Sequence, residues 1–281
     1  MAEYITKVRT NEGDKQIDYA ALANLPGINN NMLINGDFKI NQRGSTSYIQ
    51  TNTWKYSVDR WKYIGLMTVT VNESGTVILS KSDNNDKTYF SQQLEDIHGA
   101  GNFTFSFRVK SISGIMEAYI EGGDGGILTV TTPGIYQVNS SSGAKGVHFR
   151  LAGSTATVEL QWAKLEVGTV ATQFVSRLRC EEILLCQRYY EKRSVLFLPV
   201  GASSPYFNYI AANGGQHFVE KRIIPTVAID TLYNENGAIS NVAVKANTCT
   251  TQSFRSISLN DNSQCTARML SGVVTFDAEI Y

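Results

Sequence analysis

Residues 103–111, FTFSFRVKS, carry the alternation that decides the fold of this 281-residue chain. Phe103, Phe105 and Phe107 alternate with other residues, and a period of two places such side chains on one face of a half-buried strand. The same pattern recurs in MTVTVN (67–72), TVILSKS (76–82), IMEAYIEGG (115–123), GVHFRLAGS (146–154) and ATVELQWAKLE (156–166). Turn-forming residues separate these segments. Residues 29–171 are therefore predicted to form a β-sandwich with a jelly-roll arrangement.

A different pattern follows at residues 172–193, TQFVSRLRCEEILLCQRYYEKR, which contain no glycine or proline. This composition predicts a single connecting helix, with Thr172 or Ser176 as its N-cap. The apolar residues cover more than one stripe of such a helix, so it must contact more than one neighbour. We predict that this surface meets the same helix in other subunits, through Leu178, Ile183, Leu185 and Tyr189. The alternative is a helix wedged between two domains of one chain.

The two ends of the chain have different expected roles. Residues 194–281 return to strand-like segments, with a hairpin turn predicted at Asn236-Gly237, and are expected to form a smaller C-terminal β-sandwich tip domain. Residues 1–28 are too few to bury a core, so we predict an N-terminal attachment segment that docks on another protein. A frayed terminus is the alternative. The expected fold class is mostly β: a leader, a jelly-roll β-sandwich, one connecting helix and a smaller C-terminal β-sandwich.

The composition argues against several classes of protein. Lys+Arg and Asp+Glu number 25 each, whereas a nucleic-acid-binding protein needs excess cations, so no nucleic-acid partner is expected. The first residues lack the apolar core of a signal peptide, and no apolar run approaches the roughly 20 residues that span a bilayer. We therefore expect synthesis in the cytoplasm without membrane insertion. The four cysteines and three histidines lack the paired spacing of a zinc site.

Several stretches carry a resemblance to a known family. NMLINGDFKINQRG (31–44) followed by DRW (59–61), and QLEDIHGAGNFTFSFRVKS (93–111), resemble jelly-roll domains of phage tail-fibre and receptor-binding proteins. LQWAKLEVGTVATQF (160–174) and RCEEILLCQRYYEK (179–192) look like the strand and helix that follow such a domain, and the leader is similar to the N-terminal segment of these fibres. The resemblance implies a homotrimer in the virion tail. It also implies attachment to tail or baseplate proteins through residues 1–28 and adhesion to host cell-surface polysaccharide.

The same jelly roll is similar to carbohydrate-binding modules, which often hold a structural calcium ion. Their acidic residue after the NG-x-F turn is matched here by Asp37, but Lys39 stands where those modules usually have Glu. The late strand QWAKLE (161–166) also lacks their Asp pair. Because Ca²⁺ favours several carboxylates among six to eight oxygen ligands, this sequence does not favour that site. We expect no cofactor and no metal.

Sugar binding in such folds uses aromatic faces together with amide and carboxylate hydrogen bonds. Trp54 and Tyr56 share one face of a polar segment, which makes them candidate glycan-binding residues, although a tryptophan at the edge of the core is the alternative. Loops at the end of the C-terminal sandwich supply further candidates, namely Tyr206, Tyr209, Asn213 and Gln216. Trp61 and Trp162 are expected to serve packing.

No catalytic constellation is apparent, so we expect a protein that is not an enzyme. Glu95 and Asp96 are adjacent, and adjacent strand residues point to opposite faces, so they do not form the facing pair that glycoside hydrolysis needs. Two alternatives stay open. One is a glycan-degrading tail enzyme with an intersubunit site, which substitution of Glu117, Glu121 or Asp124 would test. The other is a structural collar or decoration protein without a receptor.

Overall fold

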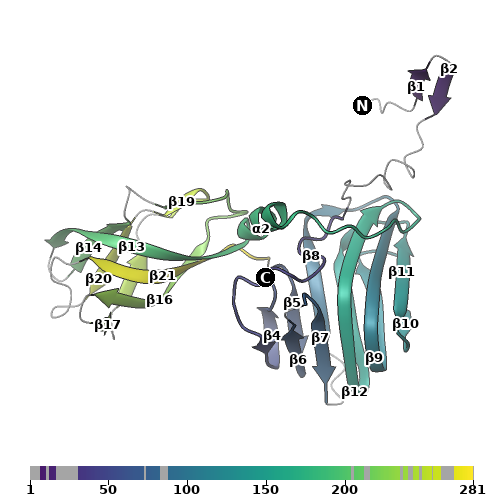
Figure 1. Ribbon diagram of the computed structural model, residues 1–281, viewed down its shortest axis with the longest axis horizontal. Coiled ribbons are helices and arrows are strands. Elements are labelled where there is room, and N and C mark those ends of the chain that lie inside the picture. The colour runs from purple at the N-terminus through teal and green to yellow at the C-terminus, as the bar shows by residue number, and fades with distance from the viewer. Residues whose placement is uncertain are drawn as a thin grey trace.

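The computed structural model describes residues 7–10, 13–16, 31–72, 74–82, 88–203, 206–211, 216–234, 237–239, 243–246, 249–254, 256–260 and 269–280. These residues form two β lobes joined by the one helix of the described part, α2 (Figure 1). The jelly-roll lobe lies between residues 31 and 171, and the C-terminal lobe lies between residues 190 and 280. The mostly β fold class is confirmed.

The jelly-roll lobe is one curled antiparallel sheet that folds into two facing layers. The first layer has the order β4-β5-β8-β12-β9-β10, and the second has the order β3-β6-β7-β12-β9-β11. The strands are β3 (Ser47–Tyr48), β4 (Thr51–Tyr56), β5 (Lys62–Gly65), β6 (Met67–Val71), β7 (Val77–Lys81), β8 (Tyr89–His98), β9 (Phe103–Glu121), β10 (Leu128–Val130), β11 (Gly134–Ser140) and β12 (Ala144–Val167).

The long strands β9 and β12 run through both layers and turn the corner between them at glycines. Gly114 has φ +91° and Gly153 has φ +75°, a region that side chains with a Cβ rarely adopt. A Cβ on Gly114 would lie 2.5 Å from the carbonyl oxygen of Thr155. The corner therefore needs glycine for both backbone conformation and space.

The core between the layers is rich in aromatic side chains. Trp61 is fully buried and stacks on Phe90, with ring centroids 4.9 Å apart. Its indole nitrogen donates a hydrogen bond to the carbonyl oxygen of Asn35 at 2.9 Å. The Asn35 side chain in turn donates to the carbonyl oxygens of Ile40 and Asp59. The NGDF and DRW motifs thus hold each other in place beside the core.

Helix α2 spans Arg179–Gln187, so the predicted helix over 172–193 is wrong at both ends. Before it, residues 171–178 lie outside regular structure, and Phe174 stacks on Trp162 instead of entering a helix. The predicted N-cap does not form, because Leu178 holds that position without a side-chain hydrogen bond. After the helix, Tyr190 pairs with Asp277 in a sheet, so tertiary pairing overrides the helical composition. No helix among the described residues is long and apolar enough to cross a membrane.

The C-terminal lobe has a seven-stranded antiparallel sheet of order β17-β16-β21-β13-β14-β20-β18 and a two-stranded ribbon, β15-β19. Its strands are β13 (Tyr190–Ser203), β14 (Tyr206–Ala211), β15 (Gln216–His217), β16 (Thr226–Asn234), β17 (Gly237–Ile239), β18 (Ala243–Ala246), β19 (Ser253–Phe254), β20 (Ser256–Asn260) and β21 (Leu270–Asp277). The ribbon packs on the sheet through Phe254, whose ring lies 5.5 Å from that of Phe276. This makes a thin second sandwich.

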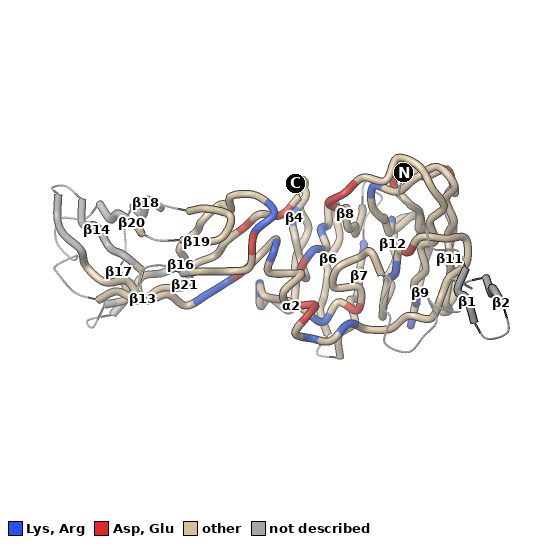
Figure 2. The backbone as a smooth tube through the Cα atoms, turned by 90° about the horizontal axis from the view of Figure 1, so that it is seen from above, with Lys and Arg blue, Asp and Glu red and all other residues tan. Residues whose placement is uncertain are grey.

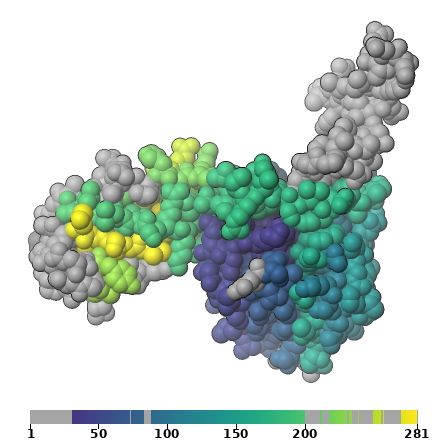
Figure 3. Space-filling model, in the orientation of Figure 1, coloured from purple at the N-terminus to yellow at the C-terminus, as the bar shows by residue number. Residues whose placement is uncertain are grey.

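In the leader, the structure describes an antiparallel hairpin of β1 (Lys7–Thr10) and β2 (Gly13–Gln16). The remaining residues of the attachment segment 1–28 lie outside the described residues. Figure 3 shows the helix region, in green, resting on the upper edge of the jelly-roll lobe where the two lobes meet. The chain after β21 also returns to this junction (Figure 1).

Candidate functional site

A row of polar and aromatic side chains crosses the outer surface of the first layer, on the side away from the core. The register aligns Lys62 of β5, Ser91 of β8, His148 of β12 and Tyr119 of β9 in that order. Trp54 of β4 is half-buried beside this row, with the Lys62 Nζ 4.8 Å from its ring centroid. We call these five residues and Tyr89, whose ring lies 6.3 Å from that of Trp54, the Trp54 face.

A chain of hydrogen bonds runs through the middle of the Trp54 face. The Ser91 hydroxyl lies 2.7 Å from His148 Nδ1, and His148 Nε2 lies 2.9 Å from Glu121 Oε2. The bond to His148 holds the pKa of the Glu121 carboxyl below its usual value. Tyr119 stacks on the imidazole at 4.9 Å, and burial raises the pKa of its hydroxyl to about 12.

Ser91, His148 and Glu121 are the residue types of a hydrolytic triad, but a nucleophile must also be accessible to its substrate. Ser91 is fully buried in the middle of a strand, so no substrate reaches its oxygen. The hydrogen bonds fix the orientation of the buried imidazole beside Trp54. Its ring lies 6.5 Å from the Trp54 ring.

The carboxylates that the hydrolytic alternative would use are each engaged by another group. Glu117 forms an ion pair with Arg150, and Glu121 binds His148. Asp124 holds the loop beside it, because its carboxylate accepts hydrogen bonds from the Ser141 hydroxyl at 2.5 Å, from the backbone N–H of Ser141 at 2.7 Å and from the Ser140 hydroxyl at 3.2 Å. These bonds lower the pKa of Asp124 to about 2.

Tyr56 does not extend the Trp54 face as predicted. It is buried, and its hydroxyl donates a hydrogen bond to the carbonyl oxygen of Ile280, which follows β21 at the end of the described chain. The guanidinium of Arg43 lies 5.2 Å from its ring centroid. The C-terminal segment therefore covers Tyr56, and Trp54 alone of the predicted pair offers a partly exposed ring.

The other predicted glycan-binding residues belong to the C-terminal lobe. Tyr206 and Tyr209 lie on β14, and Gln216 lies on β15, but their side chains are outside the described part of the structure. Asn213 lies outside the described residues altogether. The structure thus brings no described side chain of this group together with Trp54.

The four predicted oligomer-interface residues have different surroundings. Leu178 is 66% exposed, and Ile183 and Leu185 are partly buried. Tyr189 is buried inside the chain: its ring lies under the Arg60 guanidinium at 3.6 Å, and its hydroxyl donates to Glu95 at 2.5 Å. Tyr189 therefore belongs to the junction between the lobes rather than to an exposed helix face.

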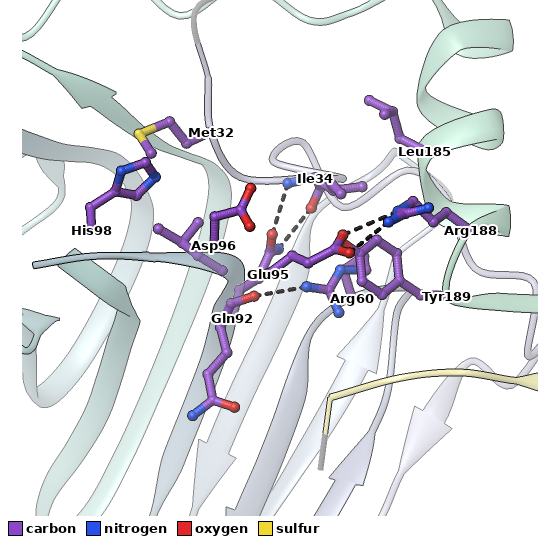
Figure 4. A pocket seen from close by; sticks show the side chains of 12 residues that line it. Met32, Ile34, Arg60, Gln92, Glu95, Asp96, His98, Leu185, Arg188 and Tyr189 are labelled. Carbon is purple, nitrogen blue, oxygen red and sulfur yellow. Dashed lines mark hydrogen bonds and ion pairs between the residues drawn. The ribbon is translucent and has the colours of Figure 1, made fainter. Parts of the chain in front are cut away.

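A cavity of about 290 Å³ lies at this junction, between the end of β8 and helix α2 (Figure 4). The Glu95 carboxylate lines this cavity. It accepts hydrogen bonds from Arg188 at 2.6 Å and from the Tyr189 hydroxyl at 2.5 Å. These bonds from Arg188 and Tyr189 lower the pKa of Glu95. Because the charged groups facing this cavity largely bind one another, we assign the cavity to the attachment of the lobes.

Behind the cavity lies a buried ionic network that joins the lobes. Glu279 of the C-terminal segment binds Arg60 at 2.8 Å and Arg43 at 3.3 Å. Asp59 lies 3.5 Å from Arg43. Burial raises the pKa of the Asp59 carboxyl to about 6, although Arg43 and hydrogen bonds from Gln42 oppose the shift. Figure 2 shows charged residues gathered around this junction.

A second cavity, of about 420 Å³, lies on the outer surface of the second layer and was not anticipated from the sequence. Trp162 and Phe174 stack in its wall, with ring centroids 4.8 Å apart and planes 8° apart. A register shift between Leu160 and Trp162 places Leu160 in the core and turns Trp162 outward. The sequence contains one sign of this bulge: the buried apolar residues fall on even positions at Val158 and Leu160 and on odd positions at Ala163 and Leu165.

The residues considered for calcium do not form a cluster of acids. The Asp37 carboxylate lies 2.8 Å from Lys39 Nζ, the residue that replaces the usual Glu. Across the described ranges, no three His, Cys, Asp or Glu side chains converge in the manner of a metal site. Among the cysteines, Cys180, Cys186 and Cys249 are free, and Cys265 lies outside the described residues.

Comparisons with known proteins found no matching family model and no matching curated protein. Among solved structures, the chain is similar to recombinant discoidin II of Dictyostelium discoideum, with 11% identity over 70% of this chain and 79% of that chain and a TM-score of 0.24. Wild-type discoidin II from the same organism matches with 10% identity over 88% and 90% of the two chains and a TM-score of 0.23. TM-scores this low do not establish a shared arrangement, and these likenesses carry no argument about function.

Proposed function

We propose that this protein binds glycan through the Trp54 face, as the receptor-binding part of a phage tail fibre. The observation that carries the glycan proposal is the partly exposed Trp54 ring beside an imidazole held in place by Ser91 and Glu121. Apolar sugar faces pack on aromatic rings, and sugar hydroxyls bind neighbouring polar groups. The phage setting rests on the sequence resemblance of residues 31–61 and 93–111.

The Trp54 face is a surface rather than an enclosed pocket, so each copy is expected to bind weakly. A trimer would raise the overall affinity by multivalency without any new contact. The exposed Leu178 and Leu184 of the helix region are consistent with a further partner at the proposed three-fold neck. Light scattering tests this part of the proposal: a mass near three times 31.0 kDa supports it, and a monomer contradicts it.

The glycan proposal is tested by calorimetry against a panel of purified bacterial capsular and lipopolysaccharide polysaccharides. Wild-type protein should bind at least one of them, and Trp54→Ala should weaken that binding about tenfold or more. Tyr233→Ala is the matched control, because Tyr233 is an exposed aromatic residue of the C-terminal lobe, and it should bind as wild type does. Equal binding by wild type and Trp54→Ala would overturn the assignment of this face.

The collar alternative makes the opposite prediction, because a protein without a receptor binds no member of the panel. The hydrolytic alternative predicts release of reducing ends from a bound polysaccharide. That release should disappear in Glu117→Ala or Glu121→Ala if either carboxylate carries the reaction. We expect no release from wild type.

A further inference from the structure

The cavity on the second layer combines an aromatic wall with polar groups that lack partners. It lies between β9, β11, β12 and residues 171–174. Ser106 is 1% exposed, and its hydroxyl has no hydrogen-bond partner in the structure. A buried hydroxyl without a partner is unfavourable, but its oxygen is closed to solvent, so Ser106 is not itself a ligand contact.

Arg108 is a cation at the rim of this cavity. The register places Arg108 beside Trp162 on one side and Ile135 on the other, and all three line the cavity. Arg108 is exposed, and no acidic side chain among the described residues forms an ion pair with it. The nearby Lys164 and Glu166 bind each other at 3.1 Å, so their charges balance. Arg108 therefore gives the cavity a net positive rim.

We propose that this cavity binds one sugar unit that carries a carboxylate. The sugar ring packs on the wall formed by Trp162 and Phe174, and its carboxylate accepts hydrogen bonds from the Arg108 guanidinium. A guanidinium suits this role because its planar donors match the two oxygens of a carboxylate. The cavity volume of about 420 Å³ is within the range of small-ligand sites. This inference rests on the proposed function, whose polysaccharide would supply the acidic sugar.

The test uses sodium glucuronate and methyl glucoside as probes of the full chain. The chain has three tryptophans, so its three indole N–H signals can be assigned by Trp54→Phe and Trp162→Phe and followed by NMR. Glucuronate should shift the Trp162 signal and bind at least fivefold more tightly than methyl glucoside. Equal binding of the two probes, or no shift of Trp162, overturns the proposal.

Two substitutions separate a binding role from a folding role. Arg108→Gln should reduce glucuronate affinity to that of methyl glucoside, whereas Lys145→Gln, an exposed cation elsewhere, should leave it unchanged. Ser106→Ala should leave glucuronate affinity unchanged and stability unchanged or higher, because it removes an unpaired buried hydroxyl that the ligand does not touch. Unchanged affinity in Arg108→Gln overturns the site.

The failure of this inference is distinguishable from failure of the proposed function. If Trp54→Ala abolishes polysaccharide binding while Arg108→Gln leaves glucuronate binding intact, the Trp54 face stands and the second site is overturned. If Arg108→Gln abolishes glucuronate binding while Trp54→Ala leaves polysaccharide binding intact, the second site is supported and the Trp54 face is not.

Discussion

The jelly-roll lobe and the C-terminal lobe each have a separate cluster of buried apolar side chains among their described residues, and the two clusters are built differently. The first cluster lies between two layers of sheet and includes the stacked Trp61 and Phe90. The second lies between a sheet and a two-stranded ribbon. The two lobes thus have different cores, and the C-terminal segment ties them together through Glu279, which binds Arg60 and Arg43 of the jelly-roll lobe.

The largest expected effect comes from the core of the jelly-roll lobe. Trp61→Ala should lower the free energy of unfolding by about 3–5 kcal/mol, because it leaves a large cavity among Phe38, Phe90 and Phe149. Urea unfolding followed by circular dichroism measures the change. Trp54→Ala, at a partly exposed position, is the matched control and should cost clearly less than Trp61→Ala. Similar losses in both variants would contradict a core centred on Trp61.

The next largest effect is expected at the junction, where a substitution tests directly whether the ionic network couples the two lobes. Glu279→Gln removes the charge that faces Arg60 and Arg43, and an uncompensated buried charge costs about 3 kcal/mol. Calorimetry should then show the C-terminal lobe unfolding before the jelly-roll lobe. Glu220→Gln, at an exposed position of the C-terminal lobe, is the control and should keep the wild-type trace. An unchanged trace for Glu279→Gln would show that the network does not couple the lobes.

The corner of the jelly roll gives a smaller effect. Gly114→Ala should lower the free energy of unfolding by about 2 kcal/mol, since φ is +91° and the new Cβ would meet the Thr155 carbonyl oxygen. Gly44→Ala shares a positive φ of +76° but has open space, so it isolates the backbone contribution and should cost less. Thermal unfolding of the two variants compares them. Equal costs would contradict a steric role for the Thr155 carbonyl.

The smallest predicted effect is a pH dependence at the junction. Because the folded-state pKa of Asp59 is about 6, above its ordinary value of 3.8, the unfolded chain loses this proton first as pH rises. The stability that protonated Asp59 contributes is present below about pH 4 and is lost as pH rises through 6. Urea unfolding at several pH values should show wild type losing on the order of 1–2 kcal/mol relative to Asp59→Asn between pH 4 and pH 7. Parallel pH profiles would contradict the raised pKa.

Local patterns were enough to predict part of the fold. Alternation predicted the strands around Phe105 and Phe149, and these face the core as expected. The helix was predicted too long because helical composition competes with contacts that are distant in sequence, such as Phe174 on Trp162 and Tyr190 beside Asp277. Helix propensity depends on the local sequence and carries no information about those contacts.

The sequence predicted only those parts of the candidate site that depend on residues close together in the chain. Trp54 was identified from its polar surroundings, and it is partly exposed. Tyr56 shares that segment, but the chain end at Ile280 covers it, and a partner more than two hundred residues away leaves no local signal. The outward turn of Trp162 depends on a bulge, which shifts the face of every later residue.

The most direct test of glycan binding at the Trp54 face is a crystal structure of the protein soaked with an oligosaccharide from a polysaccharide that it binds. We predict sugar density over the exposed side of Trp54, within hydrogen-bond distance of polar groups on the Trp54 face. Sugar density confined to the C-terminal lobe, with the Trp54 face empty, would contradict the account.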